Sequence, residues 1–235
     1  MRTVGIIQAR MQSTRLPGKV LKPMAGTPLL QVLIERVRLA RSLDDFVVAT
    51  GDVPANAPIV RLAQALGVRW FVGSELDVLG RFIAAAAQAR ADVVVRITAD
   101  NPLTEPAVID ALVAERASRG ADLALAHGLI DGAGAEVTTA EALQRARQVS
   151  STPAHREHVT IVMKEREDLF AIARWEPPVV MRRPDLSVTI DTAEEFERVR
   201  SLYEALHDDA PRLSWASAIA WLDAQARAQT RSRTV

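Results

Sequence analysis

The sequence predicts an α/β protein in which helices cover both faces of a mostly parallel sheet. Three observations lead to this prediction. Short apolar runs alternate along the chain with amphipathic segments of helical period, the pattern of parallel strands joined by helices. The first run, residues 4–7, is long enough for a strand that is buried on both faces. The chain has 235 residues, 49% of them hydrophobic, enough for the core of one large domain with or without a small appendage.

The composition limits the partners and the compartment that we expect. Lysine plus arginine and aspartate plus glutamate each number 29, so no net charge would attract nucleic acid or an anionic membrane. The chain has no cysteine, which excludes a disulfide framework and Cys-ligated zinc and fits a cytoplasmic protein. No apolar run approaches the ~18 residues that span a bilayer, and the first strand begins too early for a signal peptide. We therefore expect a cytoplasmic protein that acts on small molecules, without nucleic acid or membrane as a partner.

The first half of the chain carries the predicted parallel sheet in regular alternation. Thr27 and Pro28 have the pattern of an N-cap followed by proline at the first helical position, and the helix should run to about Arg41. The next elements expected are a strand at 46–50, a helix at 58–66 ended by Gly67, a strand at 68–72, a helix around 84–87 with Ser74 as its candidate cap, a strand within 92–98, a helix at 106–118 and a strand at 123–126.

The pattern loosens between residues 127 and 184, which we interpret as an insertion with a mixed sheet. The elements expected there are a glycine-rich loop at 128–134, helices near 140–149 and 154–165, and a strand near 170–175. Residues 186–190 are predicted to form the last core strand. Thr192 and Glu195 then make a capping box for a helix that reaches about Leu206. A terminal helix at 214–226 follows, so we expect a core of residues 1–126 plus 185–226, an inserted subregion at 127–184, and a frayed polar tail at 227–235.

A polar, cationic loop follows the first strand directly, where open α/β sheets bind their ligands. Residues 4–22 read VGIIQARMQSTRLPGKVLK. The charges of Arg10, Arg15 and Lys19 can converge there on a group rich in negative oxygens, such as a triphosphate. Gly18 would let the backbone approach this ligand closely. The loop has neither a G-x-G-x-x-G nor a G-x-x-x-x-G-K-[ST] pattern, which removes the main support for a dinucleotide site or a P-loop.

The alternative interpretation of this segment is a solvated surface loop. Two features favour phosphate binding instead. Lys19 and Lys22 are two of only three lysines in an arginine-rich chain, and a compact ammonium suits a phosphate. The loop also follows the strand without the Asn-Gly or Asp-Gly of a tight turn.

Asp100 and Asp191 form the second candidate site. Each follows a predicted core strand, so both should lie at the carboxyl edge of the sheet, beside the cationic loop. Two carboxylates beside a triphosphate suit Mg²⁺, which takes one or two protein carboxylates together with phosphate oxygens. The alternatives are that Asp191 favours a helix dipole and that Asp100 forms a turn ahead of Pro102.

These motifs resemble those of the cytidylyltransferase family, which includes the synthetases of CMP-sialic acid and CMP-KDO. The segment IIQARMQSTRLPGKVL is similar to IIQARMGSTRLPGKVL of the SpsF-like branch, linked to spore coat polysaccharide, with Gln12 in place of glycine. RITADNPLTEP resembles ITADCPLIDP, SVTIDTAEEFERVR resembles VDTPEDFERVR, and FVGSELDVLGRF resembles FRGSEEDVLDRY. The similarity extends from Val4 to about Arg200.

The resemblance implies a Rossmann-like, three-layer fold of the nucleotide-diphospho-sugar transferase type. It also implies that Asp100 and Asp191 bind Mg²⁺ and, with Arg15 and Lys19, carry the reaction. The residues expected to contact CTP are Gln8, Ala9, Arg10, Ser13, Arg15, Lys19, Ser74, Asp77, Arg81, Thr98 and Ala99. For three of these, Ser74, Asp77 and Arg81, helix capping and surface pairing remain an equal alternative.

The acceptor side follows from two weaker similarities. DGAGAEVTT resembles DGLDVEVFS, with Ala133 and Gly134 in place of Leu-Asp, and AHREHVT contains the family's REHVT. The expected contacts to the acceptor or a partner subunit are therefore Asn101, Glu136, Arg156, Glu157 and His158. The resemblance further implies a homodimer that pairs through residues 127–184.

The function expected from the resemblance is transfer of CMP from CTP to a sugar acid or a related hydroxyl or phosphate acceptor. Pyrophosphate would leave, and the product would serve polysaccharide, glycoconjugate or secondary-metabolite synthesis. Two alternatives stay open. A nucleotide-sugar glycosyltransferase would need a D-x-D motif, whereas Asp100 begins DNP and Asp191 begins DTA. A catalytically inactive nucleotide-binding homologue would explain the altered acceptor loop but not the intact RLPGK loop with both aspartates.

Overall fold

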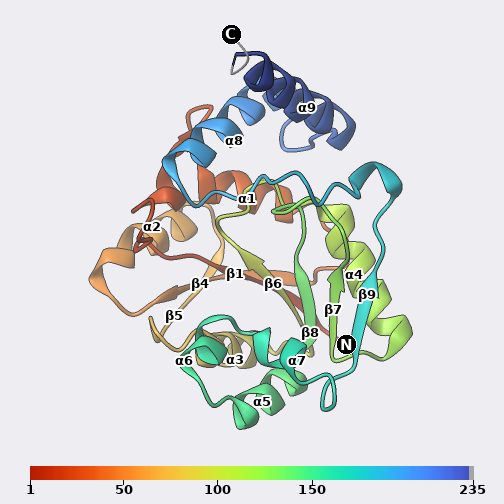
Figure 1. Ribbon diagram of the computed structural model, residues 1–235. Coiled ribbons are helices and arrows are strands. Elements are labelled where there is room, and N and C mark those ends of the chain that lie inside the picture. Colours follow the sequence, from red (N-terminus) through yellow and green to blue (C-terminus); the bar gives the residue numbers. More distant parts are fainter. Residues whose placement is uncertain (233–235) are drawn as a thin grey trace.

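Seven strands form one sheet in the computed structural model, which describes residues 1–232 (Figure 1). The strand order is β5-β4-β1-β6-β8-β7-β9. These strands are β1 (Thr3–Gln8), β4 (Asp45–Gly51), β5 (Arg69–Gly73), β6 (Val93–Thr98), β7 (Leu123–Ala126), β8 (Glu136–Thr139) and β9 (Ile172–Trp175). Strand β8 runs antiparallel to both of its neighbours, and the other pairings in this sheet are parallel. The mostly parallel α/β sheet predicted from the sequence is confirmed.

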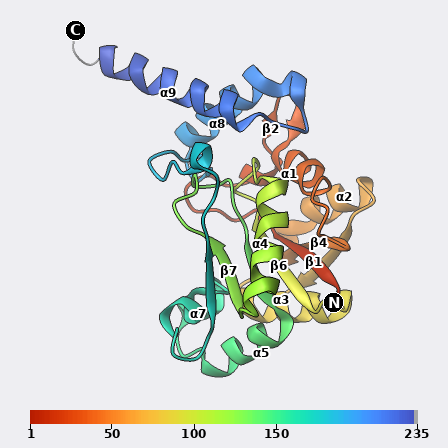
Figure 2. The same ribbon diagram turned by 90° about the vertical axis from the view of Figure 1, so that its right-hand side faces the viewer.

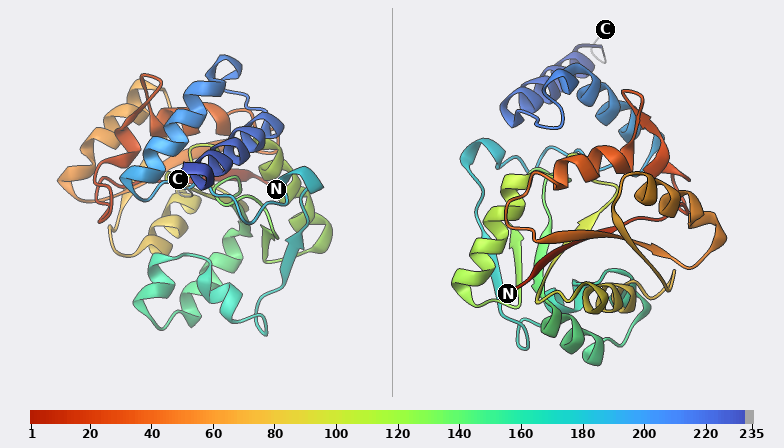
Figure 3. Two further views of the ribbon diagram at one scale, coloured as in Figure 1. Left: turned by 45° about the horizontal axis from the view of Figure 1, so that its top comes forward. Right: turned by 180° about the vertical axis from the view of Figure 1, so that it is seen from behind.

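Helices cover both faces of the sheet and give three layers, as two further views show (Figure 3). One face carries α1 (Leu29–Val37), α2 (Ala57–Ala65) and α4 (Pro106–Arg119). The other carries α3 (Val78–Ala89), α5 (Ala140–Val149), α6 (Pro153–Glu157) and α7 (Ile161–Glu165). The short helices η1 (Lys19–Leu21), η2 (Pro54–Asn56), η3 (Val179–Met181) and η4 (His207–Asp209) lie in the connections, and β2 (Pro23–Met24) pairs with β3 (Thr27–Pro28) in a small hairpin. None of the helices in residues 1–232 is long and apolar enough to cross a membrane.

The strands are apolar on both sides because each one contributes to two cores. In β1, Ile7 packs in the core on the α1 face and Ile6 in the core on the α3 face, and both side chains are fully buried. Val95 and Val94 of β6 divide between the two cores in the same way. Burial of each such side chain stabilises the fold by about 1.5–3 kcal/mol. Because both faces of these strands are buried, apolar and polar residues do not alternate along their sequences.

Two C-terminal helices, α8 (Ala193–Leu206) and α9 (Trp215–Ser232), pack outside α1 and away from the sheet (Figure 2). A buried polar group joins α9 to the core. The Arg36 guanidinium lies 2.9 Å from the Glu105 carboxylate, and Trp215 Nε1 donates to the same carboxylate at 3.0 Å. Burial lowers the pKa of Arg36, and the charge of Glu105 opposes this shift.

The prediction of a last core strand at 186–190 is wrong. These residues form an extended segment that touches residues 130–131 through one isolated bridge, Asp131 to Ser187. Val188 and Ile190 are fully buried in the core on the α1 face, and the Ile190 N–H donates to the Asp100 carbonyl. The segment has apolar residues because Val188 and Ile190 are buried in this core, and it adds no strand to the sheet.

Several helix boundaries also differ from the prediction. Thr27 belongs to the β2–β3 hairpin and does not cap α1, which ends at Val37 instead of Arg41. Asp77, not Ser74, caps α3. A break at Val159 divides the expected helix at 154–165 into α6 and α7. Helix α9 continues to Ser232, so the expected frayed tail is helical over 227–232, and 233–235 lie outside the described residues.

Candidate active site

The loop between β1 and η1 is held in one shape by backbone hydrogen bonds. The Gly18 N–H donates to the Met11 carbonyl at 2.8 Å, and Gly18 has the left-handed φ of 71° that favours glycine. The Met11 N–H donates to Asn56 Oδ1 at 2.8 Å, and Asn56 in turn donates to the Gly51 carbonyl and to Glu75. This folded loop leads directly into η1, whose first residue is Lys19.

Lys19 is the centre of the site. Its side chain is nearly buried, and its ammonium donates to the Ile190 carbonyl at 2.6 Å and to Asp191 Oδ1 at 3.0 Å. The same ammonium lies 3.5 Å from Asp100 Oδ2. Arg15 pairs with the other oxygen of Asp191 at 2.7 Å. A buried ammonium needs such partners, so Lys19 brings the two acids together at one point.

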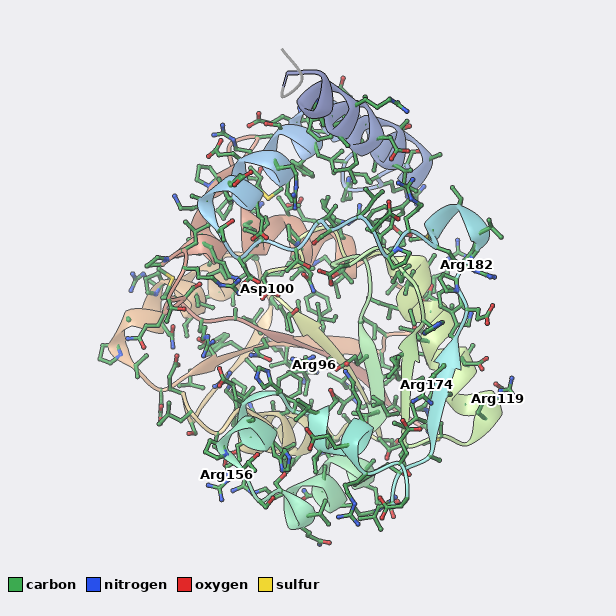
Figure 4. All side chains as sticks on the ribbon, in the orientation of Figure 1. Arg96, Asp100, Arg119, Arg156, Arg174 and Arg182 are labelled. Carbon is green, nitrogen blue, oxygen red and sulfur yellow. The ribbon has the colours of Figure 1, made fainter. Side chains whose placement is uncertain are left out.

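Two different elements position the aspartates. Asp100 follows β6, which lies beside β1 in the sheet, and the Ala99 N–H donates to the Gln8 carbonyl at 2.9 Å (Figure 4). Asp191 precedes α8, and its N–H donates to Glu195 Oε2 at 2.8 Å. Burial acts to raise the pKa of Glu195, but the N–H groups of Asp191 and Thr192 hold it below its ordinary value. The Glu195 carboxylate therefore anchors the segment that carries Asp191.

A crevice of about 270 Å³ opens between these groups. It is lined by Gln8, Arg10, Ser13, Thr14, Arg15, Lys19, Val20, Arg96, Thr98, Ala99, Asp100, Glu157, His158 and Asp191. Most of the residues proposed from the sequence for the phosphates and the metal thus share one cavity. Ala9 does not line it: this residue is fully buried, and its N–H donates to the Ala49 carbonyl. Lys22 does not line the crevice, because its ammonium lies over the Phe196 ring.

Ser74, Asp77 and Arg81 do not line this crevice. The Asp77 carboxylate caps α3 and pairs with Arg147; burial acts to raise its pKa, but these hydrogen bonds lower it. The Arg81 side chain is buried, contacts the Ser74 carbonyl, and has its Nε and Nη2 atoms without a partner. A neighbouring cavity of about 850 Å³ lies on the other side of the loop, bounded by Arg10, Ser13, Thr14, Glu75, Leu76 and Glu157 among others. The two cavities share Arg10, Ser13, Thr14 and Glu157.

A third cavity, of about 470 Å³, adjoins the crevice at Arg96 and Thr98. It is bounded by Asn101, the glycine-rich loop at 128–135, Glu136, Lys164 and Pro184, among others. Asn101 Nδ2 donates to Thr98 Oγ1 at 3.0 Å, whereas Asn101 Oδ1 is buried without a partner. Gly132 has a φ of 87°, and a side chain there would meet the Thr189 backbone, so the loop requires glycine where it crosses residues 188–189.

Glu136 is buried between positive charges. Its carboxylate accepts from Arg96 Nη1 at 2.8 Å and from Thr160 Oγ1 at 2.6 Å, and it pairs with the Lys164 ammonium. Burial acts to raise the pKa of Glu136, but the charges of Arg96 and Lys164 hold it below its ordinary value. Arg96 was not among the predicted site residues, although a charge inside the apolar run VVVRIT was a signal for it.

Residues 156–158 reach the site only in part. Glu157 and His158 line the crevice, and Glu157 lies 3.4 Å from the Arg10 guanidinium. Arg156 is exposed on α6, away from Asp100 (Figure 4). The site residues predicted from the sequence therefore divide into those that line the crevice and supporting residues that lie outside it.

The donor set fits Mg²⁺ only together with a phosphate. In residues 1–232 no group of three or more His, Asp or Glu side chains could hold a metal ion alone. Asp100 and Asp191 are partly exposed to the crevice and share one ammonium. Two carboxylates facing a cationic cavity are the ligands that Mg²⁺ takes when phosphate oxygens complete its coordination.

Known proteins resemble this chain over nearly its whole length. A family model described as cytidylyltransferase matches residues 4–227. The spore coat polysaccharide biosynthesis protein SpsF of Bacillus subtilis is 34% identical over 204 residues, which cover 85% of each chain. A solved cytidylyltransferase from Leptospira borgpetersenii superposes with a TM-score of 0.89 at 25% identity, over 97% of this chain and 96% of that one. CMP:2-keto-3-deoxy-manno-octonic acid synthetase in complex with CTP shares the fold, with a TM-score of 0.69 at 18% identity over 87% of this chain and 99% of that chain.

Proposed function

This chain belongs to the cytidylyltransferase family, and on that basis we propose that it transfers CMP from CTP to an oxygen of a small acceptor and releases pyrophosphate. The observation that carries the proposal is the buried Lys19 ammonium between Asp100 and Asp191. This arrangement places fixed positive charge and two acids at one wall of a cavity. Phosphoryl transfer needs little covalent chemistry from a protein, so positioning and charge stabilisation are sufficient.

The roles of the charged residues follow from their places in the crevice. Arg10, Arg15 and Lys19 hold the β- and γ-phosphates and neutralise the leaving pyrophosphate. Asp100 and Asp191 would hold Mg²⁺, which when bound neutralises charge on the phosphate oxygens. Arg15 and Lys19 pair with Asp191, and we propose that they exchange part of this contact for phosphate oxygens when CTP binds.

The nucleoside extends from the crevice toward the segment that joins β5 and α3. The neighbouring cavity there shares Arg10 and Ser13 with the crevice and reaches Glu75. Gln8, Ala9, Thr98 and Ala99 form the floor under the phosphates and sugar. Ser74, Asp77 and Arg81 act behind this cavity: they fix the segment that carries Glu75.

The acceptor occupies the third cavity, next to the α-phosphate. Asn101 Oδ1 is a buried oxygen without a partner, and it would accept a hydrogen bond from an acceptor hydroxyl. The acceptor class that we propose is a sugar acid or a related hydroxyl or phosphate compound. The relative SpsF supports a place in polysaccharide precursor synthesis. A cytoplasmic location and a homodimer paired through residues 127–184 complete the proposal.

The test measures pyrophosphate release by the purified protein with CTP and Mg²⁺ across a panel of sugar acids, neutral sugars and sugar phosphates. We expect pyrophosphate release only when CTP, Mg²⁺ and one class of acceptor are all present. UTP in place of CTP is the nucleotide control. Binding of CTP without release from any acceptor would favour an inactive homologue. Release of a nucleoside diphosphate from a nucleotide sugar would identify a glycosyltransferase instead.

A further inference from the structure

Glu136 has little free hydrogen-bonding capacity for a ligand, although it borders the third cavity. One carboxylate oxygen accepts from Arg96 and Thr160, and the other pairs with Lys164. The side chain is only 15% exposed. A carboxylate that already accepts from three donors is poorly suited to bind the acceptor substrate. The role of Glu136 therefore lies in the groups that these contacts hold in place.

Through Thr160, Glu136 holds a strained turn. Val159 has a φ of +48°, a conformation that is rare for a β-branched residue. The Thr160 N–H donates to the His158 carbonyl two residues earlier, which makes a tight γ-turn around Val159. The Val159 side chain is fully buried in the core on the α3 face. The turn is thus fixed on one side by packing and on the other by the hydrogen bond from Thr160 to Glu136.

This turn carries two residues into the nucleotide crevice. His158 and Glu157 immediately precede Val159, and both line the crevice. Glu157 lies 3.4 Å from Arg10, which belongs to the loop after β1. Backbone strain persists where the surrounding structure fixes it, and it gathers at functional sites.

We infer that Glu136 is a positioning residue of the nucleotide site: by holding Thr160 and the strained turn at Val159, it keeps His158 in the crevice wall and Glu157 against Arg10, which binds the triphosphate. This inference rests on the proposed use of CTP. It differs from the assignment of Glu136 as an acceptor contact, because it requires an effect on CTP binding when no acceptor is present.

The test measures CTP–Mg²⁺ affinity by calorimetry without acceptor, together with amide hydrogen exchange of residues 157–161 without any ligand. Thr160→Val removes the hydroxyl but changes neither charge nor size appreciably. We expect faster exchange in the turn and about tenfold weaker CTP binding, the effect of one hydrogen bond to a charged group. Thr160→Ser keeps the hydroxyl and should restore both values.

A second variant and a matched control separate positioning from general destabilisation. Glu136→Leu combined with Lys164→Gln removes the acceptor oxygens that hold Thr160 without changing net charge, and it should weaken CTP binding as Thr160→Val does. Asp122→Asn breaks a comparably buried ion pair, with Arg145, and should lower stability without changing CTP affinity. If the wild type binds CTP and both turn variants, correctly folded, bind it equally well, this inference is wrong and the proposed function stands. If the wild type does not bind CTP, both are overturned.

Discussion

At the scale of single residues, the site depends on the small cluster in which Lys19 meets two acids. Its charges come from residues far apart in sequence, and the pairing of Lys19 with Asp191 places the cationic loop against the start of α8. The sequence identified all three residues of the cluster. It could not reveal that the Lys19 side chain is buried, or that Arg96 and Glu136 form a second charged cluster beside the crevice, since both depend on tertiary packing.

Replacement of Asp100 tests the metal assignment. Asp100→Asn keeps the size of the side chain but removes its charge, so turnover with CTP and Mg²⁺ should fall by about 100-fold or more while the thermal midpoint changes little. Asp208→Asn is the matched control, since the Asp208 side chain is 99% exposed and lies outside the crevice. Steady-state pyrophosphate release makes the measurement, and near-normal turnover of Asp100→Asn would remove the assignment.

Replacement of Arg15 tests the phosphate loop. The Arg15 side chain is 60% exposed, so its ion pair with Asp191 contributes little to stability, roughly 0–1 kcal/mol. Arg15→Gln should therefore leave the free energy of unfolding almost unchanged and raise the KM for CTP about tenfold or more. Arg200→Gln on α8, outside the crevice, is the control. Equal KM values for Arg15→Gln and the wild type would contradict phosphate binding by this loop.

The pKa of Glu136 predicts one pH dependence of stability. Its folded-state pKa lies below the ordinary value of 4.5, so its ionised form stabilises the fold above that pH. This contribution is lost as the pH falls through the lower folded-state pKa. Unfolding of the wild type and Glu136→Gln, measured from neutral pH to about pH 3, should show a stability difference that narrows below about pH 4.5. A difference that stays constant over this range would contradict the assignment.

At the scale of elements, the helices and strands that depend on periodicity and capping could be predicted from the sequence. The elements that depend on pairing with distant segments could not. Strands β1, β4 and β6 and helix α8 with its capping box lie where expected. Strand β8 was missed because EVTT is short, half polar and follows a glycine-rich loop, and its place between β6 and β7 depends on tertiary pairing. The buried segment 186–190 has the composition of a strand, but its single bridge leaves it outside the sheet.

The capping box of α8 links helix stability to the site. Glu195 accepts from the N–H groups of both Asp191 and Thr192. Glu195→Ala should cost about 1 kcal/mol of stability and also lower turnover, because the backbone N–H of Asp191 loses its acceptor. Glu194→Ala alters the neighbouring exposed residue in the same turn and should change neither stability nor turnover. Loss of stability in Glu195→Ala with unchanged turnover would show that the cap does not position Asp191.

At the scale of the whole molecule, the carboxyl edge of the parallel sheet explains why one crevice gathers such distant residues. The loop after β1 and the segment after β6 meet there because these strands are neighbours, and this could be anticipated from the sequence. The third cavity could not be anticipated from the sequence, since it forms where the antiparallel β8 and the loop at 128–135 depart from the regular pattern of parallel strands and helices. The proposed phosphate side of the site thus follows from the regular sheet, and the proposed acceptor side from the insertion.

A crystal structure of the protein with CTP and Mg²⁺ bound would test the proposed site directly. We expect a metal ion held by Asp100 and Asp191 together with phosphate oxygens, and a triphosphate in contact with Arg10, Arg15 and Lys19. A nucleotide bound elsewhere, or a metal ion that neither aspartate contacts, would contradict it.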